Sequence, residues 1–173
     1  MRFVGIDPST KTGFVILDKH GELIDALEVT ATGQDPGRMA EIIHETFANI
    51  EPGDIVAIEG FGFASQSGFL LGGIGWGIRI KLYEWGFDYI EVAPSALKKF
   101  AGAKGNAKKD ELSVDIFKRW GFEHKSDNVR DAYVLAQIAR AYHGLMDLTK
   151  FQQEVIDAIR NPAPKKGRKR VSA

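Results

Sequence analysis

The sequence predicts an α/β protein with a mixed five-stranded sheet flanked by helices. Five short apolar runs have the length of strands, and the longer segments around them repeat apolar residues at the helical period. The first three strands follow one another without a helix between them, whereas a helix precedes each of the last two. This order favours antiparallel pairing first and parallel pairing afterwards. With 173 residues, of which 44% are hydrophobic, the chain can bury one good core but is too short for two comfortable domains.

An antiparallel meander is expected at the N-terminus. Residues 2–7, 13–18 and 23–30 form short apolar runs that suit strands. Lys19-His20-Gly21 suits a hairpin turn between the second and third strands, because glycine supplies the backbone angle that other residues avoid.

Helices alternate with strands in the rest of the chain. Pro36 is expected to open a helix, because the apolar residues from 39 to 50 follow the helical period, and residues 55–59 are expected to form the fourth strand. The fifth strand is expected at 87–92, and further helices at 67–85, 95–101, 108–120, 127–143 and 147–160. This order of elements is the outline of a ribonuclease H-like fold.

The helix expected at 67–85 is unusually rich in glycine. Each glycine weakens an isolated helix by up to about 1 kcal/mol. Glycines also permit close approach to another helix or to DNA, so this segment is a candidate dimer surface. Five glycines lie in it, at Gly68, Gly72, Gly73, Gly75 and Gly77.

Composition excludes several classes of protein. The chain has no cysteine, which excludes disulfide frameworks and thiolate metal sites. No apolar run approaches the ~20 residues that a membrane-spanning helix needs. The N-terminus already has the pattern of a strand rather than that of a signal peptide. We therefore expect a cytoplasmic protein with no membrane association.

A net charge of zero conceals a basic C-terminal segment. Five of the 23 basic residues lie beyond residue 161, which leaves 18 against 23 acidic residues, a net of −5, in residues 1–161. We expect one ribonuclease H-like domain over 1–160 and a disordered basic tail over 161–173, which either solubilises or localises the protein or contacts nucleic-acid phosphates. The basic residues of the tail are Lys165, Lys166, Arg168, Lys169 and Arg170.

Four carboxylates are placed where they could meet. Asp7 and Glu59 each end an apolar strand, where a buried charge is costly unless it is paired or bound to a metal. Asp127 and Asp131 are four residues apart, which puts them on one helical face. Taken alone, each acidic residue could have an ordinary structural role, such as forming a turn or capping a helix. Together, the four carboxylates suit two divalent ions about 3.5–4 Å apart. Oxygen ligands of this kind favour magnesium or manganese.

These residues resemble a known family. Gly5-Ile6-Asp7-Pro8-Ser9, Ile58-Glu59 and the run from Asp131 to Ala136 look like the RuvC family of Holliday-junction resolvases, specifically its compact virus-type members. The similarity covers residues 1–143. It implies a site in which four acidic side chains hold two Mg²⁺ ions, with Mn²⁺ as a substitute. By motif, Asp7, Glu59 and Asp131 match three of the four acids.

The fourth acid has three candidates. Well-known members of the family have it three residues before the last aspartate, a position that Asn128 occupies here. Asp127 lies four residues before Asp131, still on the same helical face, and is chosen as the carboxylate. Asn128 and the nearby His124 remain possible substitutes.

Lysines and aromatic residues complete the predicted site. Lys98 and Lys109 match the two catalytic lysines of the family, and Lys108 is an alternative to Lys109. The same basic segment includes Lys99 and Lys104, which with Lys108 are expected to contact DNA phosphates.

Two phenylalanines follow the predicted catalytic glutamate. Phe61 and Phe63 are either core residues or a surface that stacks on bases unpaired at a junction centre, and we expect one of them to contact DNA. Trp76 and Trp85 are expected in the core or at a dimer contact.

The resemblance therefore implies a Mg²⁺-dependent, homodimeric endonuclease that resolves four-way DNA junctions by paired symmetric phosphodiester hydrolysis. Roles in recombination and repair follow, in a bacterium or a virus-infected cell. A less selective nuclease of the same fold, acting on branched DNA, flaps or RNA–DNA hybrids, is the alternative. An actin-like sugar kinase would need a duplicated domain for which the chain has no room. A catalytically idle DNA-binding module would have no use for all four carboxylates.

Overall fold

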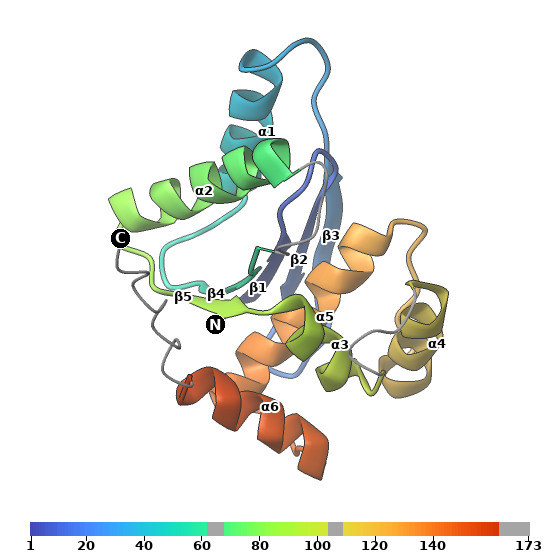
Figure 1. Ribbon diagram of the computed structural model, residues 1–173. Coiled ribbons are helices and arrows are strands. Elements are labelled where there is room, and N and C mark those ends of the chain that lie inside the picture. Colours follow the sequence, from blue (N-terminus) through green and yellow to red (C-terminus); the bar gives the residue numbers. More distant parts are fainter. Residues whose placement is uncertain (62–67, 104–108, 163–173) are drawn as a thin grey trace, which may run out of the picture.

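A computed structural model describes residues 1–61, 68–103 and 109–162, apart from the side chains of residues 68–71 and 109 (Figure 1). These residues form a mixed sheet with helices on both faces, as the sequence predicts. The strands are β1 (Phe3–Asp7), β2 (Thr12–Leu17), β3 (Leu23–Val29), β4 (Ile55–Glu59) and β5 (Tyr89–Val92). The helices are α1 (Gly37–Ala48), α2 (Gly68–Glu84), α3 (Pro94–Ala101), α4 (Lys109–Trp120), α5 (Asp127–Tyr142) and α6 (Lys150–Arg160).

The sheet has the strand order β3-β2-β1-β4-β5. The meander β1–β2–β3 is antiparallel, whereas β4 is parallel to β1 and β5 is parallel to β4. The turn between β2 and β3 contains Gly21 with a φ of +91°. Its backbone is held by Asp18, whose Oδ1 accepts from the amides of His20 and Glu22 at 2.8 and 2.9 Å. Strand β4 therefore lies directly beside β1.

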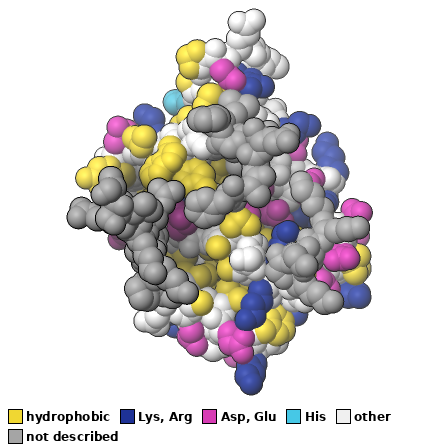
Figure 2. Space-filling view, in the orientation of Figure 1, with side chains coloured by type: hydrophobic (Ala, Val, Ile, Leu, Met, Phe, Trp, Pro, Cys, Tyr) yellow, Lys and Arg dark blue, Asp and Glu magenta, His cyan; other side chains and the backbone are white. Residues whose placement is uncertain are grey.

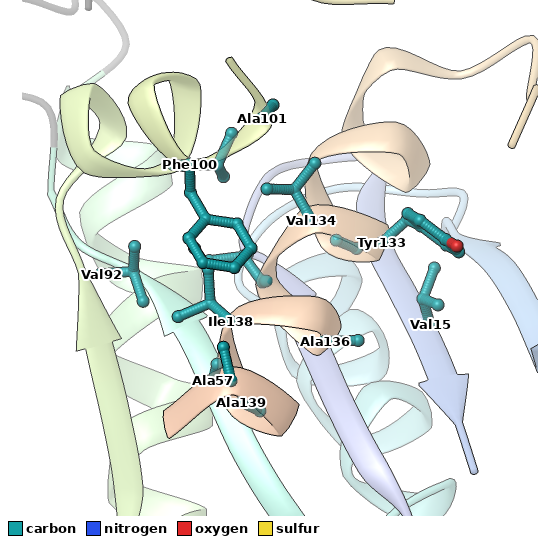
Figure 3. Packing of buried hydrophobic residues seen from close by; sticks show 14 of the residues in the cluster. Val15, Ala57, Val92, Phe100, Ala101, Tyr133, Val134, Ala136, Ile138 and Ala139 are labelled. Atoms are coloured by element: carbon teal, nitrogen blue, oxygen red, sulfur yellow. The ribbon is translucent and has the colours of Figure 1, made fainter. Parts of the chain in front are cut away.

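Alternating side chains give the sheet two apolar faces. Val4 and Ile6 of β1 pack with α1 and α2, whereas Phe3 packs on the opposite face with α3, α4, α5 and α6. Figure 3 shows this second core, in which Phe100 of α3 points toward Val92 of β5 and Ile138 of α5. The same alternation carries Gly5 and Asp7 onto the α5 face.

Helix α5 lies unusually close to the sheet. A Cβ added at Gly5 of β1 would overlap the carbonyl oxygen of Ala132, and one added at Gly13 of β2 would overlap that of Asn128. We call these two approaches the glycine contact. Because only glycine leaves room for a helix backbone here, the first three turns of α5 are held against β1 and β2.

Two glycines of α2, Gly73 and Gly77, serve packing within the chain. A Cβ at Gly73 would meet Met39 of α1, and a Cβ at Gly77 would meet Ile43 of α1. The glycine face of α2 is therefore covered by α1. The helix presents another stripe to solvent, made of Trp76, Ile80 and Tyr83.

Several element boundaries differ from the predicted ones, and three of these differences have a clear local cause. Strand β5 starts at Tyr89 rather than residue 87, because the Phe87 amide still donates to Leu82 at the end of α2, at 2.9 Å. Helix α6 starts at Lys150 rather than 147, because Thr149 forms a capping box with Gln152. Pro94 begins α3 instead of only ending the strand, since its missing N–H is not needed at a first helical position. In the described residues, no helix is long and apolar enough to cross a membrane.

Candidate active site

Asp7 and Glu59 are neighbours at one end of the sheet. They end β1 and β4, whose parallel register pairs Ile6 with Ile58 and so continues to these two acids. Both follow the alternation that places Phe3 and Ala57 on the α5 face, so both carboxylates emerge on that face. Asp7 is only 6% exposed, whereas Glu59 is half-buried.

The glycine contact brings the start of α5 to the same place. Asp7 pairs with Gly13 across β1 and β2, and Gly13 lies against Asn128 and Val129 of α5. Asp127 is the first residue of α5 and Asp131 lies one turn later, and both are half-buried. The backbone thus gathers the predicted acids at the carboxyl ends of β1 and β4.

The side chains of these acids do not converge on a single point. Among the described residues, no group of three or more histidine, cysteine or acidic side chains is arranged to hold a metal ion. The donor chemistry, however, suits a hard cation, because carboxylate oxygens from rigid elements are its preferred ligands. Glu59, Asp127 and Asp131 are all partly exposed at this end of the sheet.

Asn128 holds the loop that follows β1. Its side-chain Nδ2 donates to Lys11 O at 2.7 Å and to Ser9 Oγ at 3.1 Å. The loop is closed further by the Thr12 hydroxyl, which donates to Ser9 O at 2.7 Å. Asn128 therefore ties α5 to the segment directly after Asp7.

His124 has a local partner as well. Its Nδ1 accepts from the amide of Ser126 at 3.1 Å, just before α5 begins. The side chains of both Asn128 and His124 thus bind neighbouring segments. Asp127 as the fourth ligand therefore stays a prediction.

The predicted lysines divide into described and undescribed residues. Lys98 is half-buried on α3, which begins two residues after Val92, the register partner of Glu59. Lys99, on the same helix, donates to Glu154 Oε2 of α6 at 2.8 Å, so this predicted DNA contact is part of an ion pair. Lys109 begins α4, but its side chain lies outside the described residues. Other predicted contacts lie outside them entirely: Phe63, Lys104, Lys108, Lys165, Lys166, Arg168, Lys169 and Arg170.

Phe61 lies in an aromatic stack next to Glu59. Its ring stacks on that of Trp76 of α2, with the centroids 5.4 Å apart and the planes at 29°. Phe61 and Trp76 line a hollow of about 880 Å³ together with Gly60, Tyr89 and Glu91. The hollow therefore opens directly beside the end of β4.

Trp76 of α2 and Trp85, which directly follows this helix, are not core residues, contrary to one of the predicted alternatives. Trp76 is 57% exposed and Trp85 is also exposed. The buried side of α2 is formed instead by Ile74, Ile78 and Leu82. Trp85 contacts only the edge of the core, where its ring lies 5.7 Å from that of Phe47.

One residue of the site was missed in the sequence. Arg79 of α2 is almost fully buried and donates to the carbonyl oxygen of Glu59 at 2.8 Å. A signal for it exists, because Arg79 is the only charged residue between Glu59 and Lys81. A lone charge in such an apolar stretch must find buried partners or reach water.

The mixed sheet, with acids ending β1 and β4 and a third group on the helix packed across them, defines a protein of the ribonuclease H-like fold class. No family model matches the chain. It is similar to the crossover junction endodeoxyribonuclease RuvC of Campylobacter hominis, with 28% identity over 148 residues, 79% of this chain and 93% of the relative.

Solved structures of RuvC from Thermus thermophilus share the fold. One of them matches with a TM-score of 0.62 and 20% identity, covering 84% of this chain and 96% of the other. A second, T. thermophilus RuvC in complex with a Holliday-junction substrate, matches with a TM-score of 0.62 and 21% identity over the same shares. The resemblance to RuvC that the motifs indicate is thus confirmed by the comparisons in sequence and in fold.

Proposed function

We propose that this protein is a structure-selective endonuclease that resolves four-way DNA junctions by hydrolysing a phosphodiester in each of two strands. The observation that carries the proposal is the meeting of Asp7 and Glu59 on adjacent parallel strands beneath the start of α5. The similarity to RuvC, including a structure bound to a Holliday junction, supports the same substrate class.

In this proposal four carboxylates hold two divalent ions, normally Mg²⁺ and alternatively Mn²⁺. Asp7, Glu59 and Asp131 are three of these ligands and Asp127 is the fourth. When bound, such ions activate a water molecule and neutralise charge on the leaving oxygen. The fit rests on the donor set and on its gathering at one sheet end, and it requires the half-buried acids to turn toward Asp7.

The remaining residues of the site orient the DNA. Lys98 and Lys109 steady the scissile phosphate and its developing charge from α3 and from the start of α4. Lys99, Lys104 and Lys108 add phosphate contacts, as does the basic tail over 161–173, which follows the nuclease domain of residues 1–160. Phe61 lies beside the aromatic hollow, where it can stack on a base unpaired at the junction centre. Phe63 is a further candidate for such stacking.

The protein would act wherever DNA lies in the cytoplasm of a bacterium or a virus-infected cell.

A homodimer is part of the same proposal. A four-way junction is two-fold symmetric, so two symmetric cuts are matched by two active sites related by a two-fold axis. Trp76, Ile80 and Tyr83 form an exposed apolar stripe at spacings of four and three residues along α2. Figure 2 shows a hydrophobic patch over this helix. We assign the stripe as the surface on which a second copy packs.

The test is a substrate panel. Labelled four-way junction, flap, linear duplex and RNA–DNA hybrid are each incubated with the protein, with Mg²⁺ and with EDTA. Paired symmetric nicks in the junction alone, only with Mg²⁺, are the expected result. Equal cutting of all four substrates would replace the proposal with a less selective nuclease, and cutting in EDTA would remove the metal from it.

A further inference from the structure

Arg79 is a buried cation whose three nitrogen atoms all donate to acceptors. Its side chain is 2% exposed. Nη2 donates to the carbonyl oxygen of Glu59 at 2.8 Å, Nη1 to that of Gly75 at 3.0 Å, and Nε to Glu91 Oε2 at 3.1 Å. A guanidinium is costly to bury unless such partners satisfy it, so its position is fixed by all three.

The acceptor on β4 is the main chain of the predicted metal ligand itself. Beyond Glu59 the ladder with β5 ends, and the Gly60 amide donates to Val92 O at 2.7 Å. Arg79 donates to the carbonyl oxygen of the preceding residue, Glu59. Together these two bonds fix the peptide unit between Glu59 and Gly60, from which the glutamate side chain leaves the strand.

The flat face of Arg79 also holds the aromatic stack. Its Cζ lies 4.5 Å from the centroid of the Phe61 ring, and the Phe61 ring in turn stacks on Trp76. Gly75 makes room for this arrangement, since a Cβ there would lie 2.9 Å from Phe61 Cε1 and 3.3 Å from Arg79 Nη1. One side chain of α2 therefore contacts both residues 59 and 61.

We propose that Arg79 is a positioning residue, which holds the Glu59 carboxylate in the orientation needed to bind a divalent ion and holds the Phe61 ring beside it. The proposal rests on the proposed function only in taking Glu59 as a metal ligand. A lysine cannot reproduce it, because an ammonium group lacks the planar fork that reaches Glu59, Gly75 and Glu91 at once.

The test compares Arg79→Lys with a matched control, Arg140→Lys. Arg140 is also buried and also donates to carbonyl oxygens on separate segments: its guanidinium donates to Gln137 Oε1 at 2.6 Å and to Lys19 O and Leu145 O at 3.2 Å. It lies near the C-terminal end of α5, about 20 Å along the helix from Asp127. Three quantities are measured on the purified full chain: Mn²⁺ affinity by calorimetry, junction affinity in Ca²⁺, and the single-turnover rate of junction cleavage in Mg²⁺.

We expect Arg79→Lys to weaken Mn²⁺ binding and to slow cleavage by about tenfold to a hundredfold, the usual effect of losing a residue that orients a metal ligand. Junction affinity in Ca²⁺ should fall by less than the cleavage rate does, because Arg79 itself is buried and affects DNA only through Phe61. Arg140→Lys should leave the Mn²⁺ affinity and the cleavage rate near those of wild type. This should hold even where its thermal unfolding temperature falls as much as that of Arg79→Lys. Equal losses in both variants, or Mn²⁺ affinity in Arg79→Lys within a factor of two of wild type, would overturn the proposal.

A second variant keeps the test decisive if Arg79→Lys does not fold. Glu91→Gln leaves Arg79 in place and removes the charge of a half-exposed partner. It is expected to weaken Mn²⁺ binding by about threefold, a smaller effect than removing the fork. Unchanged Mn²⁺ affinity in this variant would then count against the proposal. Because Mn²⁺ binding is measured without DNA, a wild-type protein that binds Mn²⁺ but spares junctions would refute the proposed substrate and leave the role of Arg79 standing.

Discussion

Asp7 combines an acidic side chain with near-complete burial, and this combination makes it the most informative single residue of the site. It is 6% exposed at the end of a fully buried strand. A charge in such a position is retained where it binds a ligand or pairs with another group, because desolvation alone is costly. In the proposed metal site, Glu59 on the neighbouring strand is the second oxygen donor.

We predict that Asp7→Asn and Glu59→Gln each slow junction cleavage by on the order of 10²–10³-fold, as expected when one group that stabilises transition-state charge is lost. Both substitutions keep the volume of the side chain, so the folded structure and junction affinity in Ca²⁺ should persist. The rate is measured in single-turnover assays. Asp147→Asn, an exposed acid in the segment before α6, serves as the control. Cleavage at the wild-type rate by either site variant would contradict the assignment of the ligands.

A pH prediction follows from Asp54, which lies before β4 at the opposite end of the strand from Glu59. Burial raises the pKa of the Asp54 carboxyl, although the Glu51 amide and Arg2 both favour its charged form. A raised folded-state pKa means that the native protein holds this proton more tightly than the unfolded chain does. The contribution of Asp54 to stability is therefore largest below its unfolded pKa and declines as the pH rises through the folded pKa.

The expected result is a pH-dependent difference between wild type and Asp54→Asn. The variant lacks this titration, so its free energy of unfolding relative to wild type should rise from pH 3 toward pH 7. Urea denaturation at several pH values measures it, and the subtraction removes the other titrating groups, which both proteins share. A difference that falls over this range would show that the pairing with Arg2 outweighs burial.

At the scale of elements, the position of α5 is set by the glycine contact rather than by its own side chains. Gly5→Ala should lower the free energy of unfolding by at least about 1–3 kcal/mol, the usual cost of overpacking, because the added methyl would meet the backbone of α5 and not a flexible side chain.

Gly72→Ala is the matched control for Gly5→Ala. Gly72 has nothing within 4 Å of an added Cβ and lies inside α2. Alanine there should stabilise the protein by up to about 1 kcal/mol through helix propensity. Chemical denaturation measures both variants, and equal stability of the two would contradict the close approach of α5.

Much of the fold was predictable because each element is signalled locally. The strand at 55–59 is an uninterrupted apolar run ending in a charge, and its bounds agree with β4. Helix α5 has a clear start and a long apolar face in the sequence. The four-residue spacing of Asp127 and Asp131 could therefore be used to place both acids on one helical face.

The parts that could not be predicted depend on contacts between distant segments. Nothing near Asn128 in the sequence shows that it binds the loop at Ser9 and Lys11, 119 and 117 residues away. Likewise the burial of Arg79 depends on Glu59 and Glu91, which flank it from two different strands. The glycines of α2 suggested an interface, but periodicity alone could not say that α1 of the same chain covers them.

At the scale of the whole molecule, the apolar stripe of α2 predicts a dimer. Tyr83, which is 82% exposed, contributes a large ring to this stripe. Tyr83→Glu should weaken self-association by at least about thirtyfold, because an aromatic anchor at an interface is worth about 2 kcal/mol or more. Sedimentation over a concentration series measures the change.

The dimer prediction has its own control and consequence. Val114→Glu places the same charge on an exposed apolar residue of α4, outside the stripe, and should leave the dimer intact. In the Tyr83→Glu variant the two strands of a junction should be nicked independently, so that singly nicked junctions accumulate. A wild-type protein that is monomeric at concentrations where it makes paired cuts would contradict the symmetric arrangement.

The glycine contact also bears on how far such a chain can diverge. The spacing between α5 and the sheet is fixed by main-chain atoms, so it does not depend on which apolar side chains fill the surrounding core. Substitutions there can accumulate while the helix that carries Asp127 and Asp131 keeps its distance from Asp7. A geometry of this kind is compatible with a shared fold at only 20% identity, as between this chain and T. thermophilus RuvC.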